Sequence, residues 1–365
     1  MSKRKVIIPI FVPHKGCPHD CVFCNQRKIT GCLESATVED VRKAVLERLN
    51  TIDPEKDEIE IAFFGGSFTM IPVVEQETLL IEANRYIKEG LISDIRVSTR
   101  PDGIDEDVIE RLKKYGVTVV ELGIQSMEDK VLLESKRGYL SELVPSAIKL
   151  LKENGFTVGV QVMTGLPGST KEIEVKTTEL LCSCKPHIAR IYPALVIKDT
   201  ELERMYLEGI YKPQTVDDAV ESASEMLKIF IKHNVKVIRR GLQPTDNISE
   251  GKDVIAGPFH PSMGELVESR MYRDILEAEI LQKLRLKSKA EGHAWESSKL
   301  AVKALKITGL DIHCNPAMVS KLSGHKKSNK EYLKDLLEIK KIKIIDDAED
   351  QRIYMEFWHE LVEMA

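Results

Sequence analysis

The N-terminal region lacks an apolar run long enough to cross a membrane. Its longest run, Val6–Val12, is interrupted by Pro9 and falls far short of the roughly 20 residues that a transmembrane helix needs. The run is also too short for the apolar segment of a signal peptide. We therefore expect a cytoplasmic protein with no membrane partner, in a reducing compartment where cysteines serve metal or redox chemistry sooner than disulfides.

A strong net charge is also lacking. Lys and Arg total 53 and Asp and Glu total 58 among 365 residues, a formal net charge of −5. This balance argues against a whole surface that attracts nucleic acid, although a local basic patch is compatible with it. Aromatic residues make up only 5% of the chain, but 42% hydrophobic and 30% charged residues are ordinary for a globular protein and exclude a disordered or fibrous one.

Short apolar segments alternate with segments of helical periodicity between residues 5 and 240. The apolar segments predict strands buried on both faces: Val6–Val12, Ile59–Phe64, Asp94–Ser98, Val117–Gly123, Thr157–Met163, Ile188–Ala194 and Val235–Arg239. The periodic segments predict helices: Val38–Leu49, Val74–Lys88, Glu106–Lys114, Ser141–Asn154, Lys171–Leu181 and Val216–His233. This alternation gives a parallel sheet with helices outside it. Because a closed barrel needs eight such units, the prediction is an α/β fold with a partial (β/α)6-type barrel.

The composition shifts to turn residues around Gly241–Pro261, and we place a domain boundary there. We expect a core in residues 1–245, a linker and helical extension in residues 246–309, and a small α+β accessory domain in residues 310–365.

Most expected strands end in a polar or glycine-rich turn. Four such turns are Gly65-Gly66-Ser67, Thr99-Arg100-Pro101-Asp102, Gln125-Ser126 and Gly165-Leu166-Pro167-Gly168. In parallel α/β architectures ligands bind at the carboxyl ends of the strands. The turns therefore outline one site.

Three cysteines share one short loop. Three residues separate Cys17 from Cys21, and two separate Cys21 from Cys24. Three thiolates on such a loop can hold three corners of an iron–sulfur cube. A fourth cysteine at compatible spacing is missing, because Cys32 follows only after seven residues, so one iron stays open to another ligand. Structural zinc is the alternative, but zinc loops usually bring a second cysteine or histidine pair, and none is evident downstream.

At this loop the sequence resembles the radical S-adenosylmethionine (SAM) superfamily, whose signature is three cysteines at these spacings. The resemblance implies a [4Fe-4S] cluster whose open iron chelates SAM, and reductive cleavage of SAM to a 5′-deoxyadenosyl radical that abstracts hydrogen from the substrate. Gly65 and Gly66 look like the glycine motif that lies against the SAM amino group, where a side chain would block the backbone's approach. Ser67 stands where many members carry an acidic residue.

Further segments look like the catalytic subunit of Elongator and its relatives. They are Ser98-Thr99-Arg100-Pro101-Asp102, Glu121-Leu122-Gly123-Ile124-Gln125-Ser126, Lys136-Arg137-Gly138-Tyr139, Gly165-Leu166-Pro167-Gly168 and residues 191–200. The resemblance implies that Ser98, Gln125 and Arg137 line the SAM ribose and carboxylate. It places Phe23 and Met163 at the adenine and Tyr192 at the mouth of the site. A guanidinium can clamp a carboxylate bidentately, although Arg137 as a surface arginine and Gln125 as a satisfied polar residue are the plain alternatives.

The sequence departs from Elongator after the core. About 125 residues remain there, and no glycine-rich loop for coenzyme A is found among them, so we do not expect acetyl transfer from this chain. Gly257–Glu265 brings His260 and Glu265, which could act as acid–base groups or simply hydrogen-bond a rigid turn. Cys182 and Cys184, near a helix end, are expected to be ordinary thiols.

The order strand, helix, Gly324–Lys327 turn, helix, strand, strand from residue 310 resembles a KH RNA-binding module, whose inter-helix loop contacts nucleic-acid backbone. Lys327 stands where the KH pattern has glycine. Eight lysines, against three acidic residues, gather between residues 321 and 343: Lys321, Lys326, Lys327, Lys330, Lys334, Lys340, Lys341 and Lys343. A basic face suits phosphate contacts, and a solvated lysine-rich face is the alternative.

The sequence therefore predicts a radical SAM enzyme of the Elongator-like branch. Its expected substrate is RNA, with tRNA as the leading candidate. A flavodoxin or ferredoxin would supply the electron. Two alternatives stay open: a small-molecule reaction like that of the coproporphyrinogen oxidase branch, and a non-catalytic iron–sulfur sensing protein.

Overall fold

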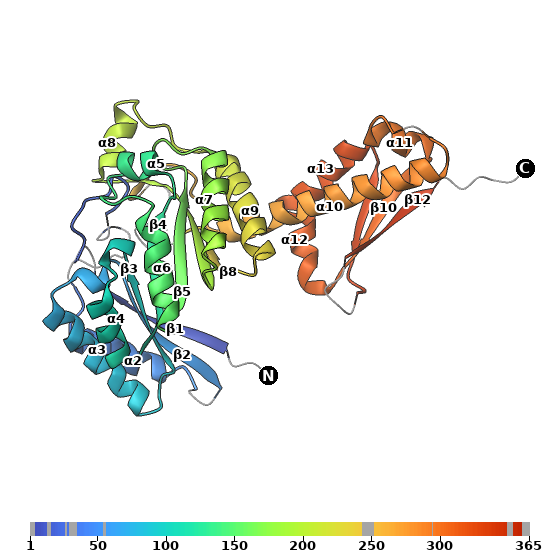
Figure 1. Cartoon of the computed structure of the whole chain (residues 1–365). Coiled ribbons are helices and arrows are strands. Elements are labelled where there is room, and N and C mark those ends of the chain that lie inside the picture. The colour runs from blue at the N-terminus through green and yellow to red at the C-terminus, as the bar shows by residue number, and fades with distance from the viewer. Residues whose placement is uncertain are drawn as a thin grey trace, which may run out of the picture. The chain divides into compact units, whose positions relative to one another are not determined.

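The structure, a computed structural model, describes residues 4–12, 16–25, 28, 35–53, 56–242, 252–293, 295–348 and 353–359. Cys32 lies outside these residues. The chain divides into two compact units, Met1–Pro261 and Ser262–Ala365 (Figure 1). In the described ranges, no helix is both long and apolar enough to cross a membrane.

The first unit is built on a seven-stranded parallel sheet. Its strand order is β1-β2-β3-β4-β5-β6-β8, and every pair of neighbours is parallel. The strands are β1 (Arg4–Phe11), β2 (Asp57–Phe64), β3 (Asp94–Thr99), β4 (Val117–Gln125), β5 (Thr157–Thr164), β6 (Ile188–Pro193) and β8 (Lys236–Arg240). The predicted partial α/β barrel is confirmed.

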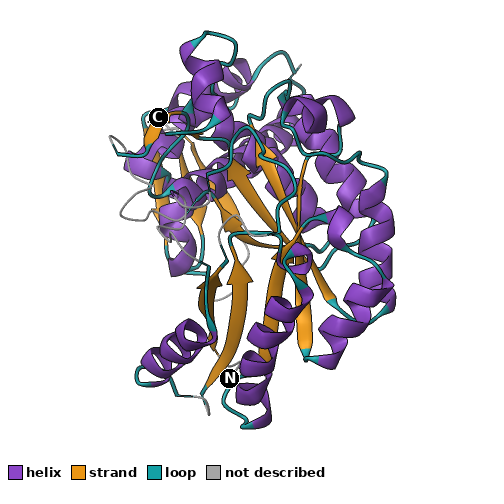
Figure 2. Ribbon diagram, turned by 90° about the vertical axis from the view of Figure 1, so that its left-hand side faces the viewer, coloured by secondary structure: helices purple, strands orange, loops and turns teal. Residues whose placement is uncertain are grey.

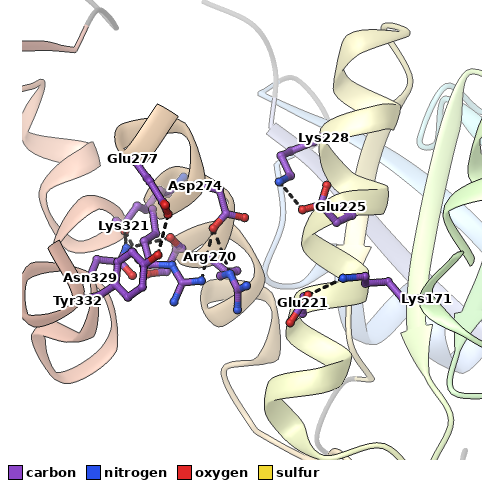
Figure 3. Close-up of polar contacts among 12 residues, drawn as sticks. Lys171, Glu221, Glu225, Lys228, Arg270, Asp274, Glu277, Lys321, Asn329 and Tyr332 are labelled. Carbon is purple, nitrogen blue, oxygen red and sulfur yellow. Dashed lines mark hydrogen bonds and ion pairs between the residues drawn. The ribbon is translucent and has the colours of Figure 1, made fainter. Parts of the chain in front are cut away.

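Helices cover the outside of this curved sheet (Figure 2). They are α2 (Val38–Leu49), α3 (Val73–Lys88), α4 (Glu106–Lys114), α6 (Leu143–Glu153), α7 (Lys171–Ser183) and α9 (Val216–Lys232). Two short helices, α5 (Asp129–Glu134) and α8 (Glu201–Leu207), lie instead at the carboxyl end of the strands, where Ser135 and Leu202 form backbone hydrogen bonds with Val22. Capping boxes at Thr37 and Thr215 begin α2 and α9 by satisfying free backbone N–H groups. The Lys171–Glu221 ion pair, 2.6 Å long, joins α7 to α9 (Figure 3).

A small antiparallel sheet lies beyond the end of β6. It pairs β7 (Val196–Ile197) with β9 (Val254–Ala256). Leu195, Ile197 and Val254 form a buried cluster there, with Phe259 packed against it. Strands of two and three residues carry too little periodicity to be predicted from sequence.

The second unit is an α+β domain with a three-stranded sheet in the order β11-β10-β12. The central strand β10 (Ile307–His313) pairs parallel with β11 (Lys341–Ile345) and antiparallel with β12 (Tyr354–His359). Its helices are α10 (Met263–Ala290), α11 (Ser298–Ala304), α12 (Val319–Ser323) and α13 (Ser328–Leu337). Leu310 and Ile312 meet Leu276, Ile280 and Leu333 in its core. The order of elements agrees with the prediction.

Candidate functional site

The cysteine loop, residues 16–25, follows β1 at the carboxyl edge of the sheet. Val22 N donates to Ser135 O at 3.3 Å, and Leu202 N donates to Val22 O at 2.7 Å. Gly16 begins the loop with φ of +75°, and a Cβ there would lie 2.3 Å from Ser67 O. The loop is therefore held by the residue that follows α5, by the turn after β2 and by the first turn of α8.

Apolar side chains surround two of the three cysteines, Cys21 and Cys24. Cys21, Phe23 and Met163 are buried in one cluster, and Cys24 and Tyr192 pack against it. The loop, β5 and β6 thus bring together the residues predicted for the adenine and for the mouth of the site.

The glycine turn after β2 faces the first cysteine. Gly65 has φ of +101°, a conformation that favours glycine, and Gly66 follows it. Ser67 is 2% exposed, and its Oγ lies 3.3 Å from Cys17 Sγ. The turn therefore lies against the cysteine loop.

Arg137 reaches the second cysteine. Its Nη1 donates to Cys21 Sγ at 3.1 Å, and its Nη2 donates to Gly123 O. Arg100 donates to the Arg137 carbonyl and forms a bidentate pair with Asp102. Arg137 is only 5% exposed, so the predicted site arginine is not a surface arginine.

The protonation of Arg137 is set by competing effects. Burial lowers the pKa of its guanidinium, but Tyr139 and the Cys21 thiol raise it, and the net direction is upward. The same burial raises the pKa of Tyr139, whose hydroxyl donates to Ile124 O at 2.9 Å. Arg137 therefore carries a permanent positive charge beside a sulfur.

The ends of β3 and β4 supply the other predicted polar residues. Gln125 is buried with φ of +72°, and its Oε1 accepts from Gln161 Nε2 at 2.7 Å. A Cβ on Gly123 would lie 3.2 Å from Gln125 Nε2 and 3.7 Å from Arg137 Nη2. Ser98 lies one strand away, paired in register with Glu121.

A buried charge network lies on one face of the sheet below these residues, and sequence reasoning missed it. Arg96 on β3 binds Glu60 on β2 and Glu121 on β4. Arg190 on β6 binds Glu121 Oε2 at 2.8 Å and donates to the Tyr192 hydroxyl at 3.1 Å. The signal in the sequence is a charged residue between apolar neighbours in four of the strands: Glu60, Arg96, Glu121 and Arg190. The network ends at Tyr192 and so connects the barrel interior to the site.

His260 lies next to Phe259, which packs on the Leu195 cluster. The other predicted catalytic residue, Tyr192, lies on β6 beside the cysteine cluster. Cys182 is buried near the end of α7, and burial raises its pKa to about 11.

The donor set fits an iron–sulfur cube. In the part of the chain that the structure describes, no three Cys, His, Asp or Glu side chains gather closely enough to hold a single metal ion. In a cube each thiolate binds a different iron, so the three sulfurs need not meet at one point. Cys17, Cys21 and Cys24 would supply three soft ligands to such a cube, and the Arg137 guanidinium would offset part of their negative charge.

Two family descriptions match the chain. "Radical SAM superfamily" matches residues 11–181, and "Radical SAM C-terminal domain" matches residues 186–273. The first match contains the cysteine loop and Arg137, and the second begins just before β6 and ends within α10.

Curated relatives include a tRNA uridine(34) acetyltransferase of Methanocaldococcus jannaschii, 28% identical over 73% of this chain and 55% of that protein. Human Elongator complex protein 3 is 27% identical over 50% of this chain and 37% of that protein. The chain spans little more than half the length of the first relative. Among solved structures, Methanocaldococcus infernus Elp3 with an N-terminal deletion has a TM-score of 0.60 at 25% identity, covering 75% of this chain and 64% of that one.

Proposed function

The chain belongs to the radical SAM superfamily, in which it is Elongator-like, and from that premise we propose that it is an enzyme that abstracts hydrogen from RNA, with tRNA as the leading candidate. Cys17, Cys21 and Cys24 would hold a [4Fe-4S] cluster, and SAM would complete its fourth iron. The single observation that carries this proposal is the cysteine loop, held by backbone hydrogen bonds, beside the buried guanidinium of Arg137.

When bound, the cluster and SAM supply one-electron cleavage chemistry that side chains cannot perform. The chain's own residues would position SAM and exclude water. Gly65 and Gly66 leave room at the amino group, Phe23 and Met163 form the adenine wall, and the polar residues Ser98, Gln125 and Arg137 line the ribose and carboxylate. Tyr192, held by Arg190, would contact the substrate, and His260 is the proposed acid–base group.

The names of the relatives support an RNA substrate, and so does the α12–α13 turn in the second unit. Gly324 has φ of +81°, and a Cβ there would lie 2.7 Å from Asn329 N. Lys326 and Lys327 follow with φ of +51° and +67°. A lysine thus occupies, in a left-handed conformation, the position where a KH loop has glycine. Left-handed lysines are strained and persist only where the surroundings hold them.

Asn329 holds the turn. Its side chain is buried and donates to Ser269 O at 2.8 Å and to Lys321 O at 3.2 Å (Figure 3). One turn further along α13, the Tyr332 hydroxyl donates to Glu277 at 2.8 Å. Lys321 and Lys334 are paired with Glu268 and Glu331.

Lys326 and Lys327 are exposed, with no ion-pair partner among the described residues. The turn therefore presents two uncompensated positive charges on a rigid support, which suits phosphate contacts.

Gel-shift titration of bulk tRNA across a salt series tests the RNA proposal. Lys326→Glu with Lys327→Glu should weaken binding and lower the salt slope by about two, one per phosphate contact. The matched control, Lys56→Glu with Lys149→Glu, changes two lysines that are 81% and 74% exposed and should bind nearly as wild type. No binding at low salt, or equal effects of both pairs, would count against RNA.

Product analysis separates the remaining classes. Reduced, reconstituted protein given SAM should form 5′-deoxyadenosine, which a sensing protein would not do. A deletion strain should lack a modified nucleoside. Accumulation of an unmodified metabolite with normal RNA nucleosides would instead favour the small-molecule reaction.

A further inference from the structure

We infer that Arg137 tunes the electron affinity of the proposed cluster through the Cys21 sulfur. This inference rests on the proposed cluster and goes beyond the SAM contact expected for the same residue. Its basis is the short contact between Arg137 Nη1 and Cys21 Sγ, 3.1 Å, made by residues 116 positions apart in the chain.

The guanidinium is held from several sides. Nη2 donates to Gly123 O and approaches the Tyr139 hydroxyl at 3.4 Å, and the Tyr139 ring lies 5.2 Å below the guanidinium carbon. Arg100 fixes the backbone carbonyl of Arg137 from the other direction. These contacts leave little freedom for the side chain to leave the sulfur.

Both partners are shielded from water. Arg137 is 5% exposed and Cys21 is 8% exposed, so their interaction is weakly screened. Reduction adds negative charge to an iron–sulfur cluster, and hydrogen bonds to its sulfurs, together with nearby charge, set its reduction potential. A fixed cation bonded to a ligating thiolate therefore stabilises the reduced state and raises the potential.

Arg137 can contact both SAM and the Cys21 sulfur, but the two contacts predict different effects of substituting it. Arg137 Nε is buried and has no hydrogen-bond partner in the described part of the chain, so no protein acceptor competes for this donor with a SAM carboxylate while Nη1 stays on the sulfur. A residue that acts only on SAM would change SAM affinity and leave the potential of the SAM-free protein unchanged.

Electron paramagnetic resonance (EPR) potentiometry on anaerobically reconstituted, SAM-free full-length protein tests the inference. Arg137→Gln should lower the ratio of reduced to oxidised cluster at a fixed potential at least tenfold, which is a midpoint about 59 mV more negative for a one-electron couple. Arg137→Lys keeps the charge without the planar fork and should fall between wild type and Arg137→Gln. Lys130→Gln, which removes a charge from a side chain that is 71% exposed, should match wild type.

A second measurement uses the wild-type protein and therefore does not depend on whether a variant folds. Wild-type protein grown with ¹⁵N-arginine should show a ¹⁵N coupling to the reduced cluster in pulsed EPR. An unchanged midpoint in Arg137→Gln, or no ¹⁵N coupling in wild type, would overturn the inference. Failure of wild-type protein to assemble any cluster would instead refute the proposed function.

Discussion

Glu121 on β4 and Arg190 on β6 form an ion pair across β5, with Oε2 and Nε 2.8 Å apart. Glu121 is 5% exposed and also binds Arg96. Arg190 then donates to the Tyr192 hydroxyl. The pair therefore links the charged interior of the barrel to a proposed substrate-facing tyrosine.

Glu121→Gln should strongly destabilise the first unit. The substitution leaves Arg190 buried without its carboxylate, and breaking a buried pair from one side costs about 3–5 kcal/mol. Urea unfolding measures this loss. Because replacing both partners is much less costly, Glu121→Gln with Arg190→Met should be more stable than Glu121→Gln alone. Equal stability of the single variant and wild type would contradict the network.

Gly16→Ala should disrupt the cysteine loop. The added Cβ would lie 2.3 Å from Ser67 O and 2.7 Å from Ile71 N, both backbone atoms, whereas the matched control Gly90→Ala, also at positive φ, meets nothing within 4 Å. Both variants carry the cost of a left-handed residue, so their difference isolates the overlap, about 1–3 kcal/mol. Iron content after reconstitution should fall in Gly16→Ala and stay normal in Gly90→Ala. Similar results for both would show that the loop tolerates a side chain there.

Glu174 should make stability depend on pH. Its side chain is 2% exposed, and Oε1 accepts from Gly165 N at 2.7 Å and Ser169 Oγ at 3.1 Å. Burial raises its pKa above the ordinary value, so its stabilising contribution is full below the unfolded pKa and is lost as pH rises through the folded pKa. The free energy of unfolding of wild type, minus that of Glu174→Gln, should therefore decrease from pH 4 to pH 8. Glu153→Gln, at a side chain 62% exposed, is the control, and a difference independent of pH would contradict the assignment.

Cys182 should resist alkylation in the native protein. Burial raises its pKa to about 11, which at pH 8 makes its thiolate fraction more than about 100-fold smaller than that of a free cysteine. Mass spectrometry after iodoacetamide treatment should find Cys182 unmodified until denaturant is added. Rapid labelling, or a disulfide with Cys184, would contradict the interpretation of an inert thiol.

The strands and the cysteine loop could be predicted because their signals are local. Buried parallel strands are apolar at consecutive positions, as in Val6–Val12, and the three cysteines lie within eight residues. The Arg137–Cys21 contact could not be derived from spacing, since it depends on how β4 and the turn after α5 meet the loop. Likewise, Glu60 and Arg96 are charged residues between apolar neighbours, and only the strand register places them together.

The α12–α13 turn shows another limit of prediction from sequence. Its lysines and its place between two helices can be seen in the sequence, but the left-handed backbone of Lys326 and Lys327 contradicts ordinary residue preference. The Asn329 contacts with Ser269 and Lys321 beside this turn are likewise supplied only by the folded domain.

The most direct measurement of the central claim is EPR of the reduced, anaerobically reconstituted protein before and after addition of SAM. We expect about four iron atoms per chain in wild type and a change in the EPR signal when SAM binds. Alanine at Cys17, Cys21 or Cys24 should abolish both, whereas Cys184→Ala should not. Protein that contains zinc in place of iron, or a reduced signal that SAM leaves unchanged, would contradict the account.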